Sequence, residues 1–167
     1  QSIFEFVKKL SDAPKIAFDF TTATVEFVEA LNKNVKGVEL VDSGEIIGRI
    51  WQNRPEVEPT KAWFLPSNAA GESIESKIEN LQKDLEKQGC EYALVSSLDD
   101  IAWLFNMRGS DIQYNPVNYA YAIVSADGAT LFIDERKLDG KCKKILAENR
   151  ISVLPYGDVY GVISAIE

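Results

Sequence analysis

The stretch "YAYAIVSADGATLFID", residues 119–134, constrains the fold more than any other part of this 167-residue sequence. Two runs of β-forming residues flank Asp127-Gly128, and an Asp-Gly pair between such runs is the strongest short-range signal for a β-hairpin. Tyr119, Tyr121 and Ile123 alternate along the first run and are expected to share one face of its strand. A hairpin here sets two antiparallel neighbours in whatever sheet the chain forms.

A long amphipathic helix is predicted over residues 72–89, "ESIESKIENLQKDLEKQG". Its apolar residues recur at helical spacing and make one stripe: Ile74, Ile78, Leu81 and Leu85. Ser73 is placed to cap the N-terminus, and Gly89 supplies the residue type that most often ends a helix.

Helical and extended patterns alternate along the rest of the chain. The first third predicts helix, strand, helix and strand over residues 3–10, 15–20, 21–31 and 36–41, with a short helix within 43–51. After the long helix come a strand at 91–97, a short helix at 97–106, the hairpin, a helix at 139–149, a strand at 151–157 and a helix from 158. The expected fold class is α/β, a mixed β-sheet flanked by helices.

The composition changes over residues 55–71, "PEVEPTKAWFLPSNAAG", which carry three prolines and little periodicity. We interpret this segment as an ordered linker between a first domain, residues 1–54, and a second domain, residues 72–167. Trp63 within the linker is expected to act as a wedge between the two domains.

The sequence contains no histidine, and this absence excludes several kinds of active site. Ser-His-Asp and Cys-His catalysis, HExxH zinc binding and imidazole acid–base chemistry all need that side chain. The formal net charge of −8 argues against DNA or RNA binding, because phosphate recognition needs a concentrated lysine and arginine surface. No apolar run approaches the ~20 residues that span a bilayer, so no membrane segment is expected.

Other features concern the extent of the chain and its compartment. The sequence does not begin with Met, shows no secretory signal and ends at "VISAIE" within an expected helix, so we expect a piece of a longer polypeptide. Cys90 and Cys142 lie far apart without a CxxC motif. Reduced thiols in a cytoplasmic protein are the expectation, and a single disulfide is the alternative.

Some residues that often mark functional sites have structural explanations here. Asp99 and Asp100 fall in the first turn of a helix that Ser97 can cap, where the helix dipole favours carboxylates. Trp51 and Trp103 fall on apolar helix faces, so both are expected to anchor the core.

The loop "NMRGSDIQYNPV", residues 106–117, is the candidate site. We interpret Asp111 as an ion-paired brace with Arg108, in preference to an acid that contacts a ligand. Gly109 is expected to allow the turn after the preceding helix, and Pro116 to set the start of the next strand.

A stripe of tyrosines follows this loop. Tyr114, Tyr119 and Tyr121 either pack on the sheet or stack on a ligand, and packing on the sheet is the ordinary explanation for side chains that alternate along a strand.

Four segments carry a family resemblance. The run "LDDIAWLFNMRGSDIQYNPVNYAYAIV" followed by "ATLFID" closely resembles the middle domain of the three-domain aminopeptidase P family, the Xaa-Pro aminopeptidases. The segment "IWQNRP" is similar to the stretch that joins the first domain to the second in that family, and "GESIESKI" resembles its Gly-rich approach to a Ser-x-x-x-Lys-Ile helix. This chain departs from the pattern after "NPV", where Asn118 replaces a hydrophobic aromatic residue.

The resemblance implies a creatinase-like α/β domain that is not itself catalytic. In this family a separate C-terminal domain removes the N-terminal residue from peptides with proline in second position. There two Asp, one His and two Glu hold two divalent metals, usually manganese. We therefore expect no cofactor or metal within this chain, a catalytic domain as its partner in the same polypeptide, and a homodimeric parent enzyme.

On this interpretation the chain shapes one side of the substrate cleft, and Arg108, Asp111, Asn115 and Tyr119 are the candidates that face it. Two alternatives stay open. One is a freestanding interaction module, or pseudo-enzyme, with the same fold. The other is the N-terminal domain of a prolidase-type Xaa-Pro dipeptidase.

Overall fold

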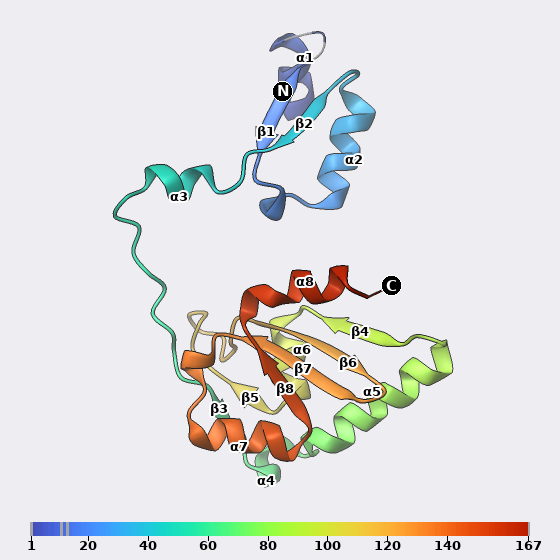
Figure 1. Cartoon of the computed structure of the whole chain (residues 1–167), viewed down its shortest axis with the longest axis vertical. Helices are drawn as coiled ribbons and strands as arrows, with labels where there is room; N and C mark the ends of the chain where they lie inside the picture. Colours follow the sequence, from blue (N-terminus) through green and yellow to red (C-terminus); the bar gives the residue numbers. More distant parts are fainter. Residues whose placement is uncertain (1, 11, 13, 167) are drawn as a thin grey trace. The chain divides into compact units, whose positions relative to one another are not determined.

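The computed structural model describes residues 2–10, 12 and 14–166. The chain divides into two compact units, Gln1–Glu56 and Val57–Glu167 (Figure 1). Each unit has its own buried apolar residues.

The first unit follows the predicted order of helix, strand, helix and strand. Its elements are α1 (Ile3–Leu10), β1 (Lys15–Phe18), the 3-10 turn η1 (Phe20–Thr22), α2 (Val25–Asn34), β2 (Glu39–Asp42) and α3 (Ile46–Ile50). The strands β1 and β2 pair in parallel, and Thr24 caps α2 by accepting a hydrogen bond from the Phe27 amide at 3.2 Å. Val7, Leu31 and Val35 make its buried centre.

A four-stranded sheet organises the second unit. Its strands lie in the order β4 (Tyr92–Val95), β6 (Ala120–Ser125), β7 (Gly128–Ile133) and β8 (Ile151–Leu154). The pair β7–β8 is parallel and the other two pairs are antiparallel, which confirms the predicted mixed sheet. The hairpin is also confirmed: Ser125 pairs with Gly128, whose φ of 145° suits glycine, so that Ala126 and Asp127 form the turn.

Helices cover both faces of this sheet. The helices of this unit are α4 (Ser67–Ala70), α5 (Ile74–Gln88), α6 (Leu98–Leu104), α7 (Gly140–Glu148) and α8 (Val159–Ser164), and all but α4 contribute to the two cores described next. The main core packs α5, α6 and α7 against one face, whereas Val159 of α8 packs against Ile123 and Phe132 on the opposite face (Figure 1). Both predicted caps of α5 are present, because Ser73 Oγ accepts from the Ser76 amide and Gly89 is left-handed.

Several short elements escaped the sequence patterns. These are β3 (Trp63–Phe64), its antiparallel partner β5 (Met107–Arg108), and the 3-10 turns η2 (Glu135–Lys137) and η3 (Tyr156–Asp158). Elements of two or three residues are too short to show a helical or strand period. Cys90 is exposed and Cys142 is buried, and the two are not joined by a disulfide. Within the described ranges, no helix is both long and apolar enough to cross a bilayer.

The prediction that two tryptophans anchor the core was wrong. Trp51 is 51% exposed and Trp103 is 55% exposed. Trp51 follows a five-residue helix whose Ile47 and Ile50 are also exposed, and on α6 the core positions belong to neighbours of Trp103. The Trp103 ring instead lies 4.3 Å from the Nζ of Lys77, so it shields a buried ammonium group.

Candidate functional site

Residues 109–117, the first part of the connection between β5 and β6, form a loop that is tied together at its neck and at its tip. At the neck, the Gly109 amide donates to the Pro116 carbonyl at 3.3 Å, and the Asp111 amide donates to the Val117 carbonyl at 3.2 Å. At the tip, the Asn115 amide donates to the Ile112 carbonyl at 3.2 Å and closes a four-residue turn. The loop therefore has a defined backbone path.

Gly109 has a different role from the one predicted. The turn after α6 uses Asn106, whose φ is 51°, and not a glycine. Gly109 is needed because the buried side chain of Asn118 lies against its backbone: a Cβ at this position would sit 2.1 Å from Asn118 Oδ1. The Asn118 side chain is 3% exposed, and its amide nitrogen and oxygen have no hydrogen-bond partner among the described residues.

The Asp111 side chain is the best-connected polar group of the loop. Its carboxylate forms an ion pair with Lys137, and the two side chains are 1% and 6% exposed. Thr60 Oγ1 donates to Asp111 Oδ1 at 2.6 Å, and the Tyr119 amide donates to Oδ2 at 2.7 Å. Asp111 thus joins the segment before β3, the loop and η2.

The prediction that Asp111 forms an ion pair that braces the loop is confirmed, but the predicted partner, Arg108, was wrong. Arg108 Nη1 donates to the carbonyls of Ala102 at 2.5 Å and Met107 at 3.0 Å. Lys137 lies 26 residues beyond Asp111, and it reaches the carboxylate only because β6 and β7 carry η2 back to the loop. No local spacing signals such a contact.

Hydrogen bonds keep the Asp111 carboxylate ionised. Burial by itself raises the pKa of this group, but the bonds from Lys137, Thr60 and the Tyr119 amide together hold the pKa below its usual value. A carboxylate that already accepts three hydrogen bonds is suited to positioning the loop rather than to proton transfer.

The other two candidates lie nearer the surface. Asn115 Nδ2 donates to Asp99 Oδ1 at 3.3 Å, which ties the loop tip to α6. Tyr119 is 41% exposed, with its ring 5.6 Å from Lys137 Nζ. Asp99 and Asp100 lie in the first turn of α6, capped by Ser97 as predicted. The four sequence candidates thus share one region of the second unit but do not converge on a single point.

The tyrosine stripe divides into two environments. Tyr121 packs on the sheet face that α8 covers, with its ring centroid 5.1 Å from that of Tyr156 and 6.3 Å from that of Tyr160. Tyr114 is 96% exposed at the loop tip. Tyr156 and Tyr160 were missed because they come from a distant segment, and no pattern links them to Tyr121.

A buried lysine supports the start of the candidate loop. Lys77 Nζ donates to the Trp103 carbonyl and to Asn106 Oδ1, each at 2.7 Å, and Asn106 Nδ2 donates to the Glu72 carbonyl at 2.9 Å. Burial lowers the pKa of Lys77, because the ammonium loses water. Its position beside the apolar stripe of α5 gave no signal of this role, since lysine is normally exposed.

The chemistry available in this region is that of a scaffold. No group of three or more histidine, cysteine, aspartate and glutamate side chains is placed to hold a metal in the part of the chain that the structure describes. A depression of about 670 Å³ between β3, the start of α5 and α7 has a mixed lining, in which Phe64, Ile74 and Ile145 lie beside polar residues such as Asp139 and Lys141. The described residues of this region can position a neighbouring surface. They offer no pair of side chains placed for acid–base catalysis.

Comparisons with known proteins connect this scaffold to a family. Residues 53–167 match the family described as the creatinase/prolidase N-terminal domain. The chain is 45% identical over 125 residues to a probable Xaa-Pro aminopeptidase P from Fusarium vanettenii, covering 74% of this chain and 20% of that protein. It is 38% identical over 151 residues to a probable Xaa-Pro aminopeptidase P from Sordaria macrospora, covering 87% and 24%.

A solved structure matches almost the whole chain. X-prolyl aminopeptidase from Caenorhabditis elegans, described as a cytosolic enzyme with a di-nuclear active site, aligns with a TM-score of 0.87 and 33% identity. The alignment covers 99% of this chain and 28% of that one. The chain therefore spans less than a third of the length of each of these relatives.

Proposed function

Because the chain belongs to the creatinase/prolidase N-terminal domain family, we propose that it is the non-catalytic N-terminal and middle region of an Xaa-Pro aminopeptidase. The observation that carries this proposal is the match to the Caenorhabditis elegans enzyme, which extends over 99% of the chain at a TM-score of 0.87. The relatives named as Xaa-Pro aminopeptidase P support the same activity for the complete polypeptide.

In this proposal the complete enzyme removes the N-terminal residue that precedes proline. A catalytic domain in the same polypeptide holds two divalent metals, with manganese as the expected ion, and the described residues of this chain contribute no ligand cluster. The enzyme acts in the cytoplasm as a homodimer. The di-nuclear site and cytosolic location in the description of the Caenorhabditis elegans relative support the metal count and the compartment.

The second domain, residues 72–167, shapes one side of the substrate cleft. The linker at residues 55–71 leads to it from the first domain, residues 1–54, and from Val57 onward belongs to the second compact unit, where β3 pairs with β5. Asn115 and Tyr119 are exposed enough to face the cleft. Arg108 and Asp111 act indirectly, because both are occupied by partners inside the second unit. Positioning of this kind orients a peptide without taking part in bond cleavage.

Activity measurements on two proteins test the proposal. The complete polypeptide is expected to hydrolyse Xaa-Pro peptides with added manganese. The isolated 167-residue chain is expected to show no turnover, and calorimetric titration with manganese is expected to show no tight binding. Turnover by the isolated chain, or its absence from the metal-loaded complete polypeptide, would contradict the proposal. The second outcome would favour an interaction module with the same fold.

A further inference from the structure

The outer edge of strand β4 has no partner among the described residues. The four-stranded sheet places β4 at one edge, with β6 as its neighbour on the inner side. Within the described residues, no backbone hydrogen bond reaches the other side of Tyr92–Val95. A strand edge presents a row of backbone N–H and C=O groups, and the group that satisfies such a row is another extended chain. The edge therefore specifies what kind of segment covers it.

The side chains of β4 also lack the features that protect a free edge. The strand reads Tyr-Ala-Leu-Val, without the lysine, proline or bulge that usually keeps an exposed edge from pairing. Tyr92 is 46% exposed and Leu94 is 54% exposed. Both lie on the sheet face that carries the buried Ile123 and Phe132. At the opposite edge, β8 leaves none of its apolar side chains exposed, so the unprotected edge is that of β4.

Helix α8 crosses this same face of the sheet toward β4. Val159, the first residue of α8, packs against Ile123 of β6 and Phe132 of β7. Just after the helix, Ile166 lines a depression of about 660 Å³ together with Tyr92 of β4. The backbone thus leads from the end of β8, over β7 and β6, to the side of the sheet where β4 lies (Figure 1).

A helix that crosses a sheet in this way is typical of a βαβ unit. In such a unit the strand after the helix is parallel to the strand before it. β8 is parallel to β7, and β7 and β4 each pair antiparallel with β6, so β4 runs in the same direction as β8. A strand that follows α8 and lies beside β4 is therefore parallel to β4.

Charges at the two ends of β4 distinguish between possible occupants of the edge. Glu91 precedes the strand, Asp99 and Asp100 follow it, and all three are exposed. Residues 88–107 contain no lysine or arginine that could balance these carboxylates. A second copy of β4 would bring like charges together, which is unfavourable. A segment that carries lysine or arginine beside its apolar run is attracted instead.

We propose that the outer edge of β4 is the docking site of one more strand of the same polypeptide, the first strand after α8. This inference rests on the proposed function, in which the chain is part of a longer enzyme. A covalently attached strand covers the edge permanently, whereas a transient partner would leave an unprotected edge open to aggregation. The docking strand is parallel to β4, mostly apolar, and flanked by lysine or arginine. β4 is then an inner strand of the sheet.

Amide hydrogen exchange of three proteins tests this inference. They are the 167-residue chain, the same polypeptide extended by about 30 residues, which is the length of a βαβ unit, and the complete enzyme. In the 167-residue chain the outward-facing amides of Tyr92–Val95 should exchange rapidly. In the two longer proteins they should exchange at least about a hundredfold more slowly, because a new ladder of hydrogen bonds holds them. The amides of β4 that face β6 are the internal control and should be protected in all three.

A carboxylate placed on this edge supplies a second readout. Leu94→Asp should raise the exchange rate of the outward-facing β4 amides in the extended chain at least about tenfold, because the carboxylate would be buried beside the docking strand. In the 167-residue chain the same change should have little effect on the urea midpoint, since Leu94 is 54% exposed there. Ser152→Asp, at an exposed position on the same face of β8, is the matched control and should leave the β4 amides unchanged.

Other outcomes overturn the inference and identify what the edge does instead. Rapid exchange in all three proteins means that the edge stays free. Slow exchange in the 167-residue chain means that the edge is already covered, and a dependence on protein concentration would assign it to a second copy. Protection in the complete enzyme alone would assign the edge to the catalytic domain.

Turnover of an Xaa-Pro peptide by the complete enzyme is measured in parallel. Absence of turnover refutes the proposed function. Normal turnover with unprotected β4 amides overturns only the inference about β4.

Discussion

Replacing Lys137 by methionine removes the charged partner of the Asp111 carboxylate while keeping most of the side-chain volume. The two side chains are 6% and 1% exposed, so water cannot take the place of the ammonium group. Breaking a buried pair from one side costs about 3–5 kcal/mol, because the remaining charge stays buried. The Thr60 hydroxyl and the Tyr119 amide still donate to Asp111. We therefore expect the free energy of unfolding to fall by about 3 kcal/mol, the lower end of that range.

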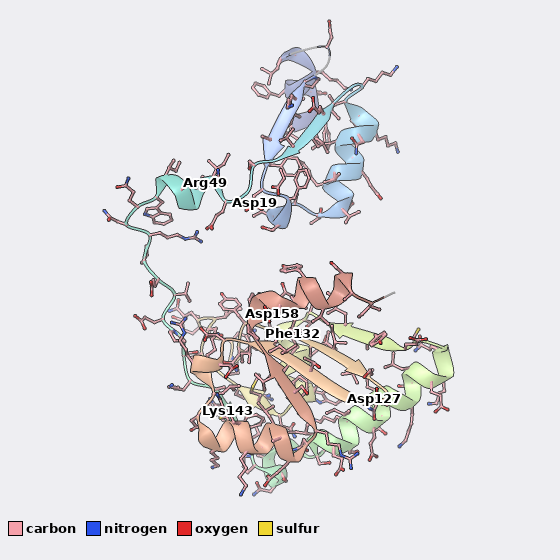
Figure 2. The ribbon with its side chains drawn as sticks, viewed as in Figure 1. Asp19, Arg49, Asp127, Phe132, Lys143 and Asp158 are labelled. Atoms are coloured by element: carbon pink, nitrogen blue, oxygen red, sulfur yellow. The ribbon has the colours of Figure 1, made fainter. Side chains whose placement is uncertain are left out.

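Urea unfolding of the chain, followed by tryptophan fluorescence, measures this loss. Domains of this size unfold with a free energy of about 5–15 kcal/mol, so a loss of about 3 kcal/mol is readily resolved. The matched control is Lys143→Met on α7, a residue labelled in Figure 2. Lys143 pairs with Glu135 at 2.9 Å, but the two side chains are 51% and 53% exposed, so at most about 1 kcal/mol is expected.

A double-mutant cycle decides whether the pair itself is responsible. In Asp111→Leu/Lys137→Met both charges are gone. The double variant should therefore lose less free energy of unfolding than the two single variants lose in sum. The coupling energy is expected to be about 2 kcal/mol or more. A Lys137→Met loss no larger than that of the control, or additive single losses, would refute the role given to this ion pair.

Two further predictions concern the same loop. Because the folded-state pKa of Asp111 is lowered, its contribution to stability is present above the unfolded-state pKa of about 3.9 and is lost as pH falls through the folded-state value. The stability difference between wild type and Asp111→Asn, from urea unfolding at several pH values, should be constant near neutrality and shrink below about pH 4; a constant difference throughout would contradict this. Asn118→Leu should raise the urea midpoint, and with it the free energy of unfolding by about 1–2 kcal/mol, because a buried amide without partners is replaced by an apolar group of similar size. A lower midpoint would show that the Asn118 amide has a partner in solution.

Local sequence patterns were sufficient for most of the regular structure. Residues 74–88 form the predicted helix between the Ser73 cap and Gly89, and the Asp127-Gly128 signal marks the hairpin. These features depend on residues a few positions apart, so periodicity, capping and turn chemistry report them directly. The order of these elements also predicted a mixed sheet, and the antiparallel pair β6–β7 and the parallel pair β7–β8 confirm it.

The family was also accessible from the sequence, through the long motif that includes the 106–117 loop. The same motif misled the interpretation of single side chains. Arg108 lies three residues from Asp111 and was the natural partner, yet the fold brings Lys137 to the carboxylate and turns Arg108 toward the carbonyls of α6 and β5. Proximity in sequence does not decide which of two cations reaches a buried acid.

The sequence by itself determined the class of fold, the principal elements and the exclusion of histidine-dependent chemistry. Only the tertiary structure decided that Trp103 is exposed over Lys77 and that Tyr114 is exposed at the loop tip. It also decided that the buried Asp111 carboxylate is fully hydrogen-bonded and ion-paired with Lys137. The physical reason is the sequence separation of the residues that interact. Helices and turns are set by neighbours along the chain, whereas burial and charge pairing depend on which distant segments the packed sheet brings together.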